Sequence, residues 1–455
     1  MNLSRKSQQF FIACIDVIIL VVAIYLSLWI RNWRMPLFTF FLRHVSYFMP
    51  IIAVWIVFLY TAGFYSLEIP HTDYRAVSLL AIVALLCTLL GFAFFYLNLE
   101  ARIVPKTVLV IHSLIVSVLL IFWRWIYYKI ILRFAANTNI AFVGINDTVF
   151  ELLKKLHNFS YMSYNALLLY TEEPCDYNAG DIRIINNPAS FIGEIKKNKI
   201  QMIIIANKEN LSTTTKNFLF ELLQSHIHFI NLTDFYEIIM RRIPIDIISG
   251  DWLLINMDLR RKKIYRLCKQ TVDTVMAVIL LLITMPFWPL IMLSIKIDSP
   301  GPAFFRQERV GYLGTLFMVT KFRTMRVENN THEPTARSDS RITKVGRFLR
   351  RTRIDEIPQF LNIIKTEMSF IGPRPERPEM IQMLEQEVSF YRQRLLVKPG
   401  LSGWDQVSGE YHSPSREDTY KKLQNDLYYI KNMSLFLDAS IFFKTLVTII
   451  KMDGV

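Results

Sequence analysis

Apolar residues dominate the first third of the chain in four long runs. Each run has about the length of roughly 20 residues that an α-helix needs to cross the hydrocarbon core of a bilayer. The runs are residues 10–30, 45–64, 77–97 and 107–126. We predict four transmembrane helices. The first is too long for a cleaved signal peptide and lacks a small-residue cleavage site, so we expect it to be retained.

The pattern changes at Asn139. Short apolar runs at residues 140–144, 166–170 and 202–206 alternate with polar stretches of helical character, which is typical of a small α/β sheet. A dinucleotide site would need a glycine-rich turn after the first strand, but no second glycine follows Gly144 there. We therefore expect a Rossmann-like module with a structural or regulatory role rather than a cofactor site.

A fifth apolar run, residues 272–295, contains Pro286 and Pro289 near its middle. Each proline removes a backbone donor, which disfavours a straight helix. Basic residues flank both ends of the run, and the positive-inside rule then predicts that both ends lie on the cytoplasmic side. We prefer a re-entrant hairpin over residues 265–297, broken at the prolines, to the alternative of a kinked transmembrane helix.

Composition agrees with a membrane protein and adds a preference for anions. Hydrophobic residues make up 52% of the 455 residues, and the formal net charge is +14. Nucleic acid, anionic lipid and phosphorylated substrates would all satisfy this charge, so it does not choose among them. The four cysteines lie far apart without a CxxC spacing, which argues against a disulfide framework or a zinc site.

An adjacent acidic pair, Asp355 and Glu356, follows the strongly basic residues 296–353. Nearby cations keep a carboxylate ionised, as a nucleophile or a metal ligand requires. Pro358 is tolerated in the first turn of a helix, so a helix through residues 359–365 should begin near Asp355. Asp355 would then be either a plain N-cap or a catalytic group at a helix terminus that also receives phosphate.

Two turn-rich segments, residues 370–375 and 398–404, look like the backbone of a binding site. The first holds Arg374 between two prolines, which limits the freedom of the loop and presents a guanidinium suited to bidentate contact with phosphate. Plain turn chemistry explains either segment equally well.

Several longer motifs follow one another in the C-terminal part of the chain. They are DSPGPAFFRQERVG (298–311), KFRTM (321–325), GRFLR (346–350), IDEIPQ (354–359), MSFIGPRP (368–375) and KPGLSGW (398–404). In this order they closely resemble the bacterial sugar transferase family, the monotopic phosphoglycosyl transferases, over about residues 265–455. The four-helix N-terminus with an α/β module resembles the large subgroup of that family, whose members start exopolysaccharide or O-antigen assembly.

The resemblance implies a ping-pong transfer of a sugar 1-phosphate from a UDP-sugar to undecaprenyl or another polyprenyl phosphate, with release of UMP. It implies that Asp355 attacks the phosphate and carries the phosphosugar, and that Glu356 binds Mg²⁺. The substrate-binding residues that it implies are Lys321, Arg323, Arg350 and Arg374. Some relatives have Ser-Pro at the helix break, whereas this chain has Met285 before Pro286.

We therefore predict a membrane α plus α/β protein of the bacterial inner membrane. Its parts are a four-helix transmembrane region (1–134), a Rossmann-like module (135–250) and a mainly α catalytic domain on the cytoplasmic face (260–455). The expected partners are a UDP-sugar, polyprenyl phosphate and membrane lipids but no nucleic acid, and homo-oligomerisation stays open.

Two alternatives to this enzyme remain. One is a membrane scaffold that recruits polysaccharide machinery. The other is a membrane-anchored nucleotide-sugar dehydratase, a class that needs a Tyr-x-x-x-Lys pair. Only Tyr265 and Lys269 fit that spacing, and they lie beside the predicted hairpin.

Overall fold

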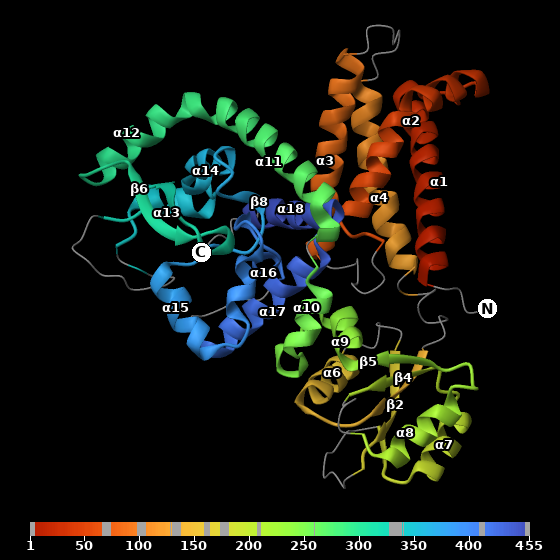
Figure 1. The fold of residues 1–455 in the computed structure, drawn as a ribbon. Coiled ribbons are helices and arrows are strands. Elements are labelled where there is room, and N and C mark those ends of the chain that lie inside the picture. Colours follow the sequence, from red (N-terminus) through yellow and green to blue (C-terminus); the bar gives the residue numbers. More distant parts are fainter. Residues whose placement is uncertain are drawn as a thin grey trace. The chain divides into compact units, whose positions relative to one another are not determined.

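The computed structural model divides the chain into two compact units, Met1–Ile247 and Ile248–Val455 (Figure 1). The residues that the structure describes are 5–65, 74–97, 106–127, 129, 138–158, 164–172, 182–206, 211–258, 260–326, 339, 341–408 and 415–450.

Four long apolar helices begin the first unit, and they confirm the four predicted helices. They are α1 (Arg5–Asn32), α2 (Phe38–Thr61), α3 (Tyr74–Leu97) and α4 (Lys106–Ile126). Each is long and apolar enough to cross a membrane. Sequential helices pack on one another and α1 also packs on α4, where Arg124 Nη2 donates to Asp16 Oδ2 at 2.6 Å. Charge inside a bilayer is costly unless paired, so this bond favours α1 and α4 as neighbours.

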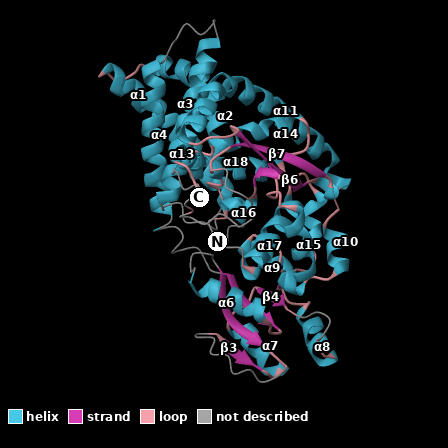
Figure 2. Cartoon of the chain, turned by 90° about the vertical axis from the view of Figure 1, so that its left-hand side faces the viewer, coloured by secondary structure: helices cyan, strands magenta, loops and turns pink. Residues whose placement is uncertain are grey.

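The rest of this unit is a doubly wound α/β module (Figure 2). Its parallel strands lie in the order β3-β2-β1-β4-β5, which confirms the Rossmann-like prediction. The strands are β1 (Thr138–Val143), β2 (Tyr164–Tyr170), β3 (Arg183–Ile185), β4 (Met202–Ile205) and β5 (His228–Asn231). The helices are α6 (Asp147–Asn158), α7 (Pro188–Lys197), α8 (Thr213–Leu222) and α9 (Leu232–Met240), and the 3₁₀ turn η3 (Ile245–Ile247) follows.

Alternation along β1 builds both faces of this sheet. Ile140 and Phe142 belong to the core under α6 and α9, whereas Ala141 and Val143 belong to the core under α7 and α8. Successive strand residues point to opposite faces, so an unbroken apolar strand is buried on both sides.

The second unit begins with α10 (Gly250–Asn256), the 3₁₀ turn η4 (Arg260–Lys262) and a broken apolar helix. Helix α11 (Lys263–Thr284) is followed by a 3₁₀ turn, η5 (Met285–Phe287), and then by α12 (Trp288–Asp298), which together form a bent arc (Figure 1). The break therefore lies at Pro286, as predicted, and Pro289 falls in the first turn of α12, where its missing N–H costs nothing. The arc exposes most of its apolar side chains, and its re-entrant topology stays a prediction.

The remaining elements of this unit are mainly helical. The strands are the antiparallel pair β6 (Phe304–Val310) and β7 (Leu316–Phe322) and the parallel pair β8 (Ser369–Ile371) and β9 (Gly400–Ser402). The helices are α13 (Lys344–Arg351), α14 (Phe360–Ile364), α15 (Pro378–Glu387), α16 (Trp404–Val407), α17 (Arg416–Asn432) and α18 (Leu435–Ile450). The 3₁₀ segments are η6 (Tyr312–Gly314), η7 (Ile354–Gln359) and η8 (Tyr391–Leu396).

Candidate active site

The acidic pair lies in the first turn of η7, which packs against β7 and α13. The helical segment begins at Ile354, close to the predicted start. It is a 3₁₀ helix as far as Gln359, however, and becomes α-helical only at Phe360. The N-cap is Arg353 rather than Asp355, so the interpretation of Asp355 as a plain N-cap is wrong.

Glu356 is buried and surrounded by cations. Its Oε1 accepts from Lys321 Nζ at 2.9 Å and from Arg374 Nη2 at 3.1 Å. Arg353 Nη1 lies 3.7 Å from Oε2. Burial by itself would raise the pKa of Glu356, but the charges of Lys321 and Arg374 outweigh burial and hold that pKa below its usual value. Glu356 is therefore an ionised carboxylate.

Asp355 lies next to the same cations but is not tied to them. No ion pair or hydrogen bond engages its carboxylate within the described part of the chain. Burial and the neighbouring charge of Glu356 raise its pKa above the usual value, while Lys321 and Arg350 oppose that shift. One acid of the pair is thus fixed, and the other keeps its oxygens available for a substrate.

Lys321 and Arg350 reach the pair from neighbouring elements. Lys321 is the next-to-last residue of β7, and burial lowers its pKa while Glu356 acts in the opposite direction. Arg350, in the last turn of α13, donates through Nε to Thr324 Oγ1 at 3.0 Å. Because Thr324 is the second residue after β7, this bond fastens α13 beside the strand that carries Lys321.

Two other arginines fix the backbone around Arg374. Arg394 Nη2 donates to the Arg374 carbonyl at 2.9 Å, and Arg309 Nη1 donates to the next carbonyl, that of Pro375, at 3.0 Å. A Cβ on Gly372 would lie 2.5 Å from the Lys398 carbonyl oxygen. The two turn-rich segments therefore pack tightly together through β8 and β9, and only glycine fits that approach.

Arg323 does not join the other three predicted substrate-binding residues. It is buried, and its two terminal nitrogens donate to the Ser299 and Pro300 carbonyls at 2.6 and 2.7 Å. These bonds tie the end of β7 to the turn after α12. Substrate binding by Arg323 stays a prediction, but these contacts give it a role in fixing that turn.

Metal binding was assigned to Glu356. Among the described residues, no group of three or more histidine, cysteine or acidic side chains is arranged around a metal site. Magnesium is commonly bound through one or two carboxylates plus substrate phosphates and water. Oε2 of Glu356 is buried without a hydrogen-bond partner, so the pair fits a hard cation that takes its other ligands from water and from substrate phosphate.

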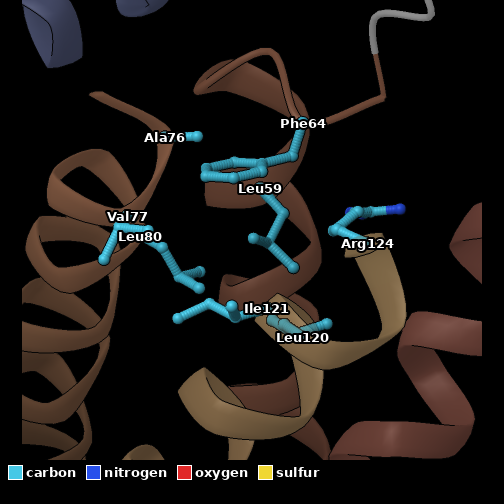
Figure 3. Close-up of a pocket in the computed structure, with 8 residues that line it drawn as sticks. All are labelled: Leu59, Phe64, Ala76, Val77, Leu80, Leu120, Ile121 and Arg124. Carbon is cyan, nitrogen blue, oxygen red and sulfur yellow. The ribbon is translucent and has the colours of Figure 1, made fainter. Parts of the chain in front are cut away.

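A small pocket between α2, α3 and α4 is lined by apolar side chains and Arg124 (Figure 3), and none of the predicted site residues lines it.

The hydroxyl of Tyr265 and the ammonium of Lys269 both donate to Asp438 Oδ2, at 2.6 and 2.9 Å. This pair therefore joins α11 to α18, and nothing in its contacts supports the dehydratase alternative.

Arg353 is not among the residues that the sequence predicts for the site. One signal that marks it is its spacing, because residues three apart in a helical turn share a face, and Arg353 precedes Glu356 by three. The backbone of Arg353 is in the left-handed conformation, and nothing in the sequence indicates this.

Two family models match segments of the chain. A family model described as bacterial sugar transferase matches residues 264–452, and one described as a CoA-binding domain matches residues 60–230.

Three relatives match the chain in part. The UDP-N-acetylgalactosamine-undecaprenyl-phosphate N-acetylgalactosaminephosphotransferase of Aeromonas hydrophila is 37% identical over 53% of this chain and 57% of its own length. The UDP-glucose:undecaprenyl-phosphate glucose-1-phosphate transferase of Xanthomonas campestris pv. campestris is 31% identical over 68% of this chain and 66% of its own length. A Caulobacter vibrioides protein of the same name as the Xanthomonas protein is 36% identical over 41% of this chain and 71% of its own length. The chain thus spans less than two thirds of the first two proteins.

Proposed function

The chain belongs to the bacterial sugar transferase family, and on that premise we propose that it transfers a sugar 1-phosphate from a UDP-sugar to undecaprenyl phosphate, releasing UMP. The observation that carries this proposal is the division of the acidic pair. Glu356 is held by Lys321 and Arg374, whereas Asp355 makes no such bond within the described residues. A covalent catalyst needs a carboxylate that is held beside phosphate-binding cations and is free to attack.

Each step of the proposed reaction has a residue to perform it. An Asp355 oxygen attacks the phosphorus next to the sugar, the bond from that phosphorus to the bridging oxygen breaks, and UMP leaves. An oxygen of undecaprenyl phosphate then attacks the same phosphorus, and the Asp355 carboxylate is released. Lys321, Arg350 and Arg374 neutralise the phosphate charge during both steps.

Mg²⁺ belongs to the proposal as well. Glu356 would hold it through Oε2, with Asp355 beside it, and the ion would neutralise phosphate charge. Lys321 and Arg374 keep the Glu356 carboxylate ionised and oriented for this role.

The names of the relatives support the class of substrate but not one sugar. The Aeromonas protein is named for N-acetylgalactosamine, and the Xanthomonas and Caulobacter proteins are named for glucose. We therefore propose a UDP-hexose in general as donor, at the first membrane step of exopolysaccharide, O-antigen or capsule synthesis.

The apolar helices support a location in a membrane. We propose that the chain lies in the bacterial inner membrane with the acidic pair on the cytoplasmic side, and that α11 and α12 enter and leave the bilayer by that side. In a cysteine-free background, Lys263→Cys and Arg306→Cys flank this segment. A membrane-impermeant maleimide added to spheroplasts should leave both unlabelled, and it should label both in inverted vesicles. Opposite labelling would show a true span.

The reaction is tested with the purified full-length chain, Mg²⁺ and a panel of UDP-sugars. With undecaprenyl phosphate, one donor should give continuous UMP release. Without acceptor, the same donor should give about one UMP per enzyme and a phosphosugar on the protein. Asp355→Asn should abolish both signals, and Glu385→Gln, an exposed acid on α15, is the matched control. Continuous UMP release by Asp355→Asn would overturn the assignment of Asp355 as the nucleophile. If the unchanged chain released no UMP from any donor, the scaffold alternative would be favoured.

A further inference from the structure

Arg353 joins α13 to η7 through a strained backbone. Its φ of 55° and ψ of 18° lie in the left-handed region, where a long side chain is rarely found. Glycine would adopt this conformation without cost. Strain of this kind clusters at functional sites, where the surrounding structure holds it in place.

The side chain of Arg353 faces the oxygen of Glu356 that the other cations leave open. Lys321 and Arg374 both donate to Oε1. Arg353 Nη1 lies 3.7 Å from Oε2, beyond hydrogen-bond distance, and Oε2 is buried with no hydrogen-bond partner. The contact is thus an ion pair without a hydrogen bond, so little bonding is lost when Arg353 moves away.

A divalent cation would need the same oxygen. Oε1 already accepts two hydrogen bonds, so Oε2 is the atom of Glu356 that remains for a metal ligand bond. Two cations at one oxygen repel each other at this range, so Arg353 and the metal ion compete. A guanidinium that leaves Oε2 stays beside the site, and its planar geometry suits phosphate oxygens.

We propose, on the basis of the proposed function, that Arg353 is a displaceable cation. It neutralises Oε2 of Glu356 in the free enzyme, leaves that oxygen when the divalent cation binds, and then contacts the diphosphate of the UDP-sugar. The affinity of the site for the cation is therefore set in part by Arg353.

The first test measures Mn²⁺ binding to the purified full-length chain in detergent by electron paramagnetic resonance, with no substrate present. Arg353→Asn removes the charge and keeps a residue that tolerates the left-handed region. It should bind Mn²⁺ about two- to fivefold more tightly, which is the strength of an ion pair of this kind. Arg353→Lys keeps the charge and should bind Mn²⁺ like the unchanged chain. Glu356→Gln should lose the binding.

The second test measures UDP binding by calorimetry at saturating Mg²⁺. Arg353→Asn should bind UDP about tenfold more weakly, because a charge-assisted contact to phosphate is lost. The two shifts have opposite signs, whereas a merely structural role would weaken both ligands or neither. Unchanged or weaker Mn²⁺ binding in Arg353→Asn, or Mn²⁺ binding that survives Glu356→Gln, would overturn the proposal.

UMP release separates this proposal from the reaction itself. A chain that releases UMP but shows no Mn²⁺ shift in Arg353→Asn refutes only the role of Arg353. A chain that shows both opposite shifts but releases no UMP supports that role and refutes the transfer reaction.

Discussion

The α/β module and the C-terminal unit bury different kinds of side chain. Within the described residues between 138 and 247, the interior is almost entirely apolar, and Arg242 is the only charged residue that is buried. In the second unit, the described residues bury a whole set of charges. They are Asp273, Arg323, Asp355, Glu356, Arg394, Asp405, Asp426 and Asp438.

The two kinds of interior contribute differently to stability. Two apolar clusters hold the sheet of the module from both faces. Buried charges stabilise poorly, because desolvation offsets much of their attraction, and they persist where their positions serve another purpose. Here two of them are the acidic pair itself, and a third, Arg394, holds the carbonyl of Arg374. The second unit should therefore lose transfer before it loses folding, and the module should do the reverse.

Of three substitutions that test this difference between the two parts, Lys321→Met should have the largest effect on transfer. It removes one of two hydrogen bonds to Oε1 of a buried carboxylate and a charge beside Asp355. Loss of one preorganised electrostatic contact typically costs about 10²–10³-fold in rate. The measurement is UMP release under saturating UDP-sugar, with circular dichroism as the folding control. A rate within threefold of the unchanged chain would contradict a role for Lys321 in the site.

Gly346→Ala should have an intermediate effect. A Cβ at Gly346 would lie 2.0 Å from the Thr324 carbonyl oxygen, so α13 must shift, and Arg350 moves with it. Overpacking of this kind costs about 1–3 kcal/mol. We expect transfer to fall about tenfold by the same UMP assay.

Gly193→Ala in α7 is the matched control. Nothing lies within 4 Å of its added Cβ, and alanine favours a helix over glycine by about 1 kcal/mol. Thermal unfolding of the module should therefore occur at the same or a higher temperature, with unchanged transfer. Equal loss of transfer in both variants would show that the close approach at Gly346 is unimportant.

Much of this fold could be predicted from periodicity alone. The four apolar helices, the break at Pro286 and the apolar strands β1, β2 and β4 depend on local patterns that the sequence carries openly. The strands β3 and β5 did not stand out as apolar runs. β3 has only three residues, and β5 begins with His228 and ends with Asn231, whereas β4, equally short, is entirely apolar.

The sequence predicts which residues belong to the site, but not which contacts each of them makes. Lys321 and Arg323 belong to one motif, yet β7 ends at Phe322 and Arg323 turns toward the carbonyls at Ser299 and Pro300. A basic motif does not tell which cation pairs with an acid and which with backbone. Tertiary contacts decide that, and the 3₁₀ form of η7 is decided in the same way.

Of the three test substitutions, Phe142→Ala should have the smallest effect on transfer, together with a large effect on folding. Phe142 is fully buried in β1 between Phe235 and the other apolar residues of its face. Its truncation leaves a cavity and should destabilise the module by about 3–5 kcal/mol. The module would then unfold at a lower temperature in a thermal scan, while UMP release well below that temperature stays within twofold. If transfer were lost at the same temperature as the module unfolds, the module would support the reaction directly. The apolar module and the charged catalytic unit would then not have separate tasks.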